Sequence, residues 1–250
     1  MARVGRRGRV GAIVVVATAL AAVLAPGAGA QAPQPDPRAE AAALARIAVD
    51  ARAKLRVRAP LVERSLKRLE RFSEGCPAFE RASSRAPEED VEALSVAVTT
   101  RFFYGPLLGT LDRFAGDLEA AAVTDSALRD GVMGWRTAVQ SLQLFARLPD
   151  RLCAAVRRWA RAGYPRERAP IDADELNRAD KRGERAVKTI ERGSRRLRAL
   201  GASTGAAKAF TLEGLLEASL STLEESEEGS SGSPQARSLS SAASIRVARP

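Results

Sequence analysis

The chain has 250 residues, of which 45% are hydrophobic and 28% charged, a balance typical of one globular domain that buries a core. It contains no histidine, which excludes the Ser-His-Asp and Cys-His arrangements of nucleophilic enzymes and most zinc, haem and copper sites. Its 40 basic and 30 acidic residues give a formal net charge of +10, a basic balance that favours anionic partners.

Residues 1–30 have the pattern of a secretory signal that is removed from the mature protein. Four arginines precede an apolar stretch of about 15 residues, which is shorter than the ~20 that span a bilayer. Ala28 and Ala30 are the small residues that a signal peptidase requires, so we expect cleavage between Ala30 and Gln31 rather than retention as an anchor. The preference for arginine over lysine is typical of bacterial proteins from GC-rich genomes. We therefore expect a secreted or extracytoplasmic bacterial protein.

The rest of the chain shows helical rather than strand periodicity. Residues 31–35 form a proline-rich spacer, and Asp36-Pro37 is typical of a helix start, with Asp as N-cap and Pro in the first turn. Apolar residues at helical spacing then continue to Phe72, and Gly75 and Pro77 predict the end of this first helix, before a polar loop that runs to Ala86.

Four more helices are predicted after this loop. Three begin at acidic residues typical of helix starts, and their expected ranges are 87–123, 125–159 and 172–200; a shorter one covers 210–223. No segment alternates with a period of two. The sequence therefore predicts an all-α domain over residues 36–224, an up-and-down antiparallel bundle of four long helices plus a shorter fifth. Residues 225–250 are acidic and then rich in Ser and Gly, which predicts a disordered tail.

The two cysteines, Cys76 and Cys153, are predicted to form a structural disulfide. In an antiparallel arrangement both lie near the same end of the bundle, since each residue of a helix rises 1.5 Å. An exported chain with an even number of cysteines is expected to be oxidised. The absence of a Cys-x-x-Cys motif and of histidine argues against a reactive thiol or a metal site.

One face of the predicted fourth helix is strongly basic and lies opposite its apolar face. Residues 151–200 hold 15 basic and 7 acidic side chains, so the positive charge of the chain is concentrated here. This ridge predicts a surface for anionic polymers of the cell envelope or for a membrane surface of lipid headgroups. The alternative is a solvated face neutralised by the acidic cluster 224–228 or by i,i+4 pairs, for which Asp174–Arg178, Glu184–Lys188 and Glu191–Arg195 are the candidates. The ridge consists of Arg178, Lys181, Arg182, Arg185, Lys188, Arg192 and Arg196.

Three prolines interrupt the predicted helices at similar heights in the bundle, namely Pro60, Pro106 and Pro149. Kinks at one level could leave an apolar cavity for a small apolar ligand. The alternative is that each proline ends a helix or that core side chains fill the space. The residues expected to line such a cavity are Phe102, Phe103, Leu107 and Leu142.

Two acidic clusters could supply a pair of carboxylates for acid–base catalysis, residues 88–92 and 172–175. Both stand at predicted helix starts, where capping and the helix dipole already account for them. We therefore expect a non-enzymatic protein, without catalytic residues, metal or cofactor, which acts by binding or as a structural element. Because its mature net charge would be only +6 after the loss of four arginines, nucleic acid is not an expected partner.

Overall fold

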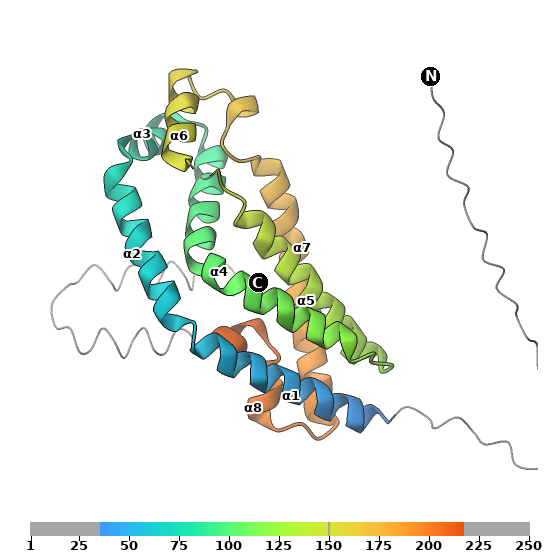
Figure 1. Ribbon diagram of the computed structural model, residues 1–250. Coiled ribbons are helices and arrows are strands. Elements are labelled where there is room, and N and C mark those ends of the chain that lie inside the picture. The colour runs from blue at the N-terminus through green and yellow to red at the C-terminus, as the bar shows by residue number, and fades with distance from the viewer. Residues whose placement is uncertain (1–35, 150, 218–250) are drawn as a thin grey trace, which may run out of the picture. The chain divides into compact units, whose positions relative to one another are not determined.

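The structure is a computed structural model, and its description is confined to residues 36–149 and 151–217. The predicted signal segment 1–30, the spacer 31–35 and the tail 225–250 lie outside the described residues. Every regular element of the described residues is helical, including a last segment from residue 212 to residue 217 (Figure 1). The elements are α1 (Pro37–Arg56), α2 (Ala59–Gly75), α3 (Pro77–Arg85), α4 (Glu88–Ala120), α5 (Ser126–Phe145), α6 (Leu152–Arg161), the 3₁₀ helix η1 (Arg166–Arg168), α7 (Ala173–Ala199) and α8 (Thr204–Ala209).

Several helices begin where a short polar side chain can satisfy the free N–H groups of the first turn. Asp36 accepts a hydrogen bond from the N–H of Arg38, and Asp125 and Asp172 do the same at the starts of α5 and α7. These three caps are the starts that the sequence predicted. Ser203 caps α8, a short helix that the sequence analysis did not predict.

The prolines have different effects on the helices. Pro60 lies in the first turn of α2, so the predicted single helix from residue 36 to 72 is wrong and the chain breaks at Val57 and Arg58. Pro149 likewise lies between α5 and α6, where one helix was predicted. Pro77 begins α3 inside the predicted polar loop, because a proline needs no N–H partner in a first turn. Among the described prolines only Pro106 lies in a helix beyond its first turn, and α4 bends visibly along its length (Figure 1).

Helices α5 and α7 lie side by side in close contact (Figure 1). Glycines make this approach possible, since a Cβ built on Gly131 would lie only 3.1 Å from the Cα of Gly193. One helical turn along, a Cβ on Gly134 would lie 2.9 Å from the carbonyl oxygen of Ala186. The all-α class is thus confirmed for the described residues, whereas the up-and-down order of four long helices stays a prediction.

The buried side chains form two clusters. The first contains Trp135, Phe114 and Phe210 and is built from α1, α4, α5, α7 and the segment around α8. The second contains Trp159 and joins α3, α6 and the first turns of α4 and α7. The predicted disulfide between Cys76 and Cys153 is confirmed, with a Cα–Cα distance of 5.7 Å, and it ties the α2–α3 junction to α6.

Candidate functional site

Most of the basic face of α7 is exposed and has no ionic partner among the described residues. Six of its cations have exposed side chains, and none of them forms an ion pair or a hydrogen bond with any described residue. They cover residues 178 to 192, about 21 Å of helix at 1.5 Å per residue. We call these six the basic ridge: Arg178, Lys181, Arg182, Arg185, Lys188 and Arg192.

The i,i+4 pairs that could neutralise this face do not form in the described part of the chain. Asp174, a candidate partner of Arg178, instead binds Arg166 at 2.9 Å. Neither Glu184 nor Glu191 has an ion pair with a described residue. The charge of the basic ridge is therefore not balanced within the described residues.

Arg196, the seventh predicted member, has a structural role instead. Its Nε and Nη2 atoms donate to one carboxylate oxygen of Asp125 at 2.9 and 2.7 Å. The other carboxylate oxygen of Asp125 accepts from the N–H groups of Ala127 and Leu128 and so caps α5. The hydrogen bonds from Arg196 hold the pKa of Asp125 below its usual value. Sequence reasoning missed this pair because Asp125 lies 71 residues away.

Glu40 of α1 extends the same network. Its carboxylate accepts hydrogen bonds from the N–H and hydroxyl of Thr124 and from the N–H of Asp125. These bonds, first that of the Thr124 hydroxyl, lower the pKa of Glu40. The network thus connects α1, the α4–α5 turn and α7.

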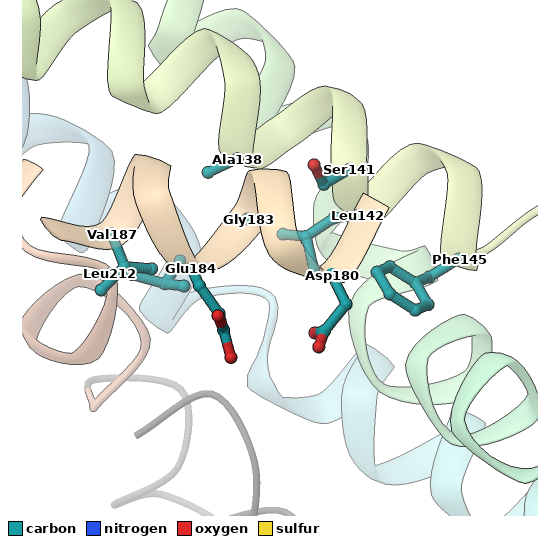
Figure 2. A pocket seen from close by; sticks show the side chains of 9 residues that line it. All are labelled: Ala138, Ser141, Leu142, Phe145, Asp180, Gly183, Glu184, Val187 and Leu212. Carbon is teal, nitrogen blue, oxygen red and sulfur yellow. The ribbon is translucent and has the colours of Figure 1, made fainter. Parts of the chain in front are cut away.

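The four residues predicted to line an apolar cavity do not gather around one space. Phe103 and Leu107 are buried in the first cluster, and Phe102 packs against the second cluster, with its ring centroid 6.2 Å from that of Phe72. Leu142 alone lines a pocket of about 60 Å³ between α5 and α7 (Figure 2). Its walls are Ala138, Ser141, Leu142, Phe145, Asp180, Gly183, Glu184, Val187 and Leu212.

Two carboxylates of this pocket, Asp180 and Glu184, are one turn apart on α7. Burial raises the pKa of Asp180, and repulsion from Glu184 raises it further. Neither carboxylate has an ionic partner among the described residues. Sequence analysis did not place these two in one pocket, because the pocket exists only where α5 packs on α7.

The two acidic clusters meet around η1, where the starts of α4 and α7 approach each other. Arg166 binds Glu89 at 3.5 Å and Asp174 at 2.9 Å. Asp172 caps α7 as predicted. Asp90 is buried, with 3% exposure, and neither of its carboxylate oxygens has a hydrogen-bond partner. Its pKa is raised by burial, against the opposing effect of Arg166.

Among the described residues there is no group of three or more His, Cys, Asp or Glu side chains that could hold a metal ion. None of the helices in the described residues combines the length and the apolar composition that a bilayer span requires. Comparison of the chain with models of known protein families, with curated proteins and with solved structures finds no match. The function must therefore be inferred from the surfaces of the chain itself.

Proposed function

We propose that this protein is a non-enzymatic binding protein that holds a linear anionic polymer on the basic ridge of α7. The observation that supports this most strongly is the set of six exposed cations without an ion pair in the described residues. Cations spaced three and four residues apart on a helix repel one another, so an anionic partner relieves an unfavourable arrangement. The predicted export signal would bring the protein to the polymers of the envelope or the exterior.

The shape of the ridge supports a polymer rather than a single small anion. The ridge extends over about 21 Å along one helix, and four of its six members are arginines, which bind phosphate or carboxylate groups through two parallel hydrogen bonds. Among the described residues, the exposed large apolar side chains are Val49, Val57, Val96 and Met133, and all lie outside α7. The ridge therefore offers no apolar group for insertion into lipid.

The test compares two variants that change the net charge equally. The variant R178Q/R185Q/R192Q removes half of the ridge, whereas R46Q/R56Q/R58Q removes three exposed arginines of α1 and the α1–α2 junction. Glutamine and arginine have similar helix propensities, so both variants should fold. Binding to polyphosphate and to poly-glutamate is measured as a function of salt, with vesicles of anionic lipid as a separate probe.

We expect the ridge variant to bind both polymers at least tenfold more weakly and to lose about two to three units of the slope of log K against log salt. The control variant should lose less than threefold. Equal losses in the two variants would mean that only the net charge matters, and the proposal would be wrong. Preferential retention on vesicles, lost in the ridge variant, would reassign the ridge to a membrane surface.

A further inference from the structure

The described chain ends close to α7, the helix that carries the basic ridge. Leu212, in the helical segment 212–217, lies beside Val187 of α7, where both side chains line the pocket between α5 and α7 (Figure 2). Glu217, the last described residue, binds Lys208 at 2.8 Å and Arg52 at 3.4 Å. These ion pairs hold the point from which the rest of the chain continues.

The sequence beyond this point contains one group of acidic residues. Glu224, Glu225, Glu227 and Glu228 follow one another closely, and residues 218–250 hold no other acidic side chain. The basic ridge presents six cations that have no ion pair with a described residue. Four carboxylates opposite these cations relieve most of the repulsion among them, since opposite charges at close range attract. The two groups are complementary in sign and similar in number.

The linker between Glu217 and the acidic cluster is long enough to reach the ridge. Glu217 is about 7.5 Å of helix beyond Leu212, at 1.5 Å per residue. Lys188, the ridge residue next to Val187, is turned about 100° from it around α7, which adds less than a helix diameter of about 10–12 Å. An extended chain from Glu217 to Glu224 spans up to about 23 Å. The cluster therefore reaches the ridge without any movement of the described helices.

We propose that the acidic cluster 224–228 docks on the basic ridge of α7 and competes there with the anionic polymer. Because the two groups belong to one chain, the short linker gives the cluster an effective concentration on the order of millimolar at the ridge. The apparent affinity for the polymer is then lower than the intrinsic affinity, in proportion to the fraction of molecules whose ridge is free. The competition rests on the proposed function, whereas the docking itself does not.

Docking is measured on the full chain without polymer. A nitroxide is attached at S226C, since both native cysteines are joined in the disulfide. We expect it to broaden the amide resonances of residues 181–192 of α7 and to leave those of α3 unchanged, although Arg81 and Arg85 of α3 are also exposed. Salt at 1 M, where the screening length is about 3 Å, should abolish the broadening. The substitutions E224Q/E225Q/E227Q/E228Q should abolish it as well.

Competition is measured as the affinity for polyphosphate. We expect E224Q/E225Q/E227Q/E228Q to bind polyphosphate about threefold to tenfold more tightly than the unchanged chain, because its ridge is no longer occupied. The matched control E70Q/E74Q/E80Q/E88Q removes the same number of exposed carboxylates from α2, α3 and α4. Its affinity should change less than about twofold, since those positions do not occupy the ridge.

Each part of the proposal has its own contrary result. Absence of broadening on α7, or equal broadening on α7 and α3, would overturn the docking whether or not the ridge binds a polymer. Equal gains in affinity for the glutamine variant and its control would overturn the competition. Failure of the proposed function is distinguishable, because the nitroxide would still broaden α7 while R178Q/R185Q/R192Q would leave polymer binding unchanged.

Discussion

Three carboxyl groups of this protein have pKa values that are shifted in opposite directions by their surroundings. The carboxyl of Asp90 is buried without a partner, whereas those of Asp125 and Glu40 accept several hydrogen bonds each. Burial raises the pKa of the first and hydrogen bonding lowers the pKa of the other two. Folding stability should therefore respond to pH in two opposite ways at these positions.

We predict that Asp90→Asn stabilises the protein at neutral pH. The folded-state pKa of Asp90 is raised above 3.8, so its ionisation above that pH costs stability that the neutral amide does not lose. The gain should be about 1 kcal/mol, or roughly 2–4 °C in Tm, and should disappear below about pH 3.8, where the carboxyl is protonated in both states. Thermal unfolding at several pH values measures it, with the exposed Glu88→Gln as control. A gain that is independent of pH would contradict this explanation.

The Asp125 network should give the reverse pH dependence. Because the folded-state pKa values of Asp125 and Glu40 are lowered, their contribution is complete above about pH 4.5 and is lost as pH falls through the folded values. We predict that Asp125→Asn, which can still cap α5, costs about 1 kcal/mol through the loss of the Arg196 interaction. Asp125→Ala should cost about 1 kcal/mol more because the cap is also lost. Urea unfolding at pH 7 and pH 3 compares the two, and equal costs would contradict the separation of cap and ion pair.

Among the helices, the contact of α5 with α7 has the most specific geometry. It depends on glycines that the sequence pattern does not distinguish from other small residues, because only the register of two helices shows which of them meet. The same register creates the pocket between α5 and α7, which explains why the sequence did not identify Ser141, Asp180 and Glu184 as neighbours.

We predict that Gly134→Ala destabilises the protein although alanine favours a helix. The new Cβ would lie 2.9 Å from the Ala186 carbonyl oxygen and 2.3 Å from Oγ1 of Thr189, so α7 must move away. Overpacking of this kind costs about 1–3 kcal/mol. Gly109→Ala is the matched control, since its Cβ meets nothing within 4 Å and should stabilise α4 by about 1 kcal/mol. Urea unfolding measures both, and stabilisation by both substitutions would show that α5 and α7 are not in close contact.

The helix starts that have an aspartate as N-cap were predictable from the sequence. Asp36, Asp125 and Asp172 act through local hydrogen bonds to the next turn, so their effect is readable from a few residues. A proline alone does not predict whether a helix ends, because Pro60 lies in the first turn of a new helix while α4 continues through Pro106. The tertiary contacts that decide between these outcomes involve residues far away in the chain. The exposure of the basic ridge was likewise predictable from periodicity, whereas the Arg196–Asp125 pair was not.

At the scale of the described domain, the open point is whether the two core clusters unfold together or separately. The disulfide joins α6 to the α2–α3 junction within the second cluster, and closing a loop between residues 77 apart contributes up to about 4.5 kcal/mol by the chain-entropy estimate. Each cluster holds one buried tryptophan, Trp135 in the first and Trp159 in the second. The two indoles therefore report on the two clusters separately.

We predict that Cys76→Ser/Cys153→Ser loosens the second cluster before the first. Helices α3 and α6 pack mainly on each other, so without the disulfide their attachment depends on the apolar contacts of the second cluster alone. In single-tryptophan forms made with Trp135→Phe or Trp159→Phe, the Trp159 signal should unfold at lower urea than the Trp135 signal once the disulfide is absent. With the disulfide intact the two transitions should coincide. Coincident transitions in both forms would mean that the clusters unfold as one cooperative unit and that the disulfide stabilises the domain uniformly.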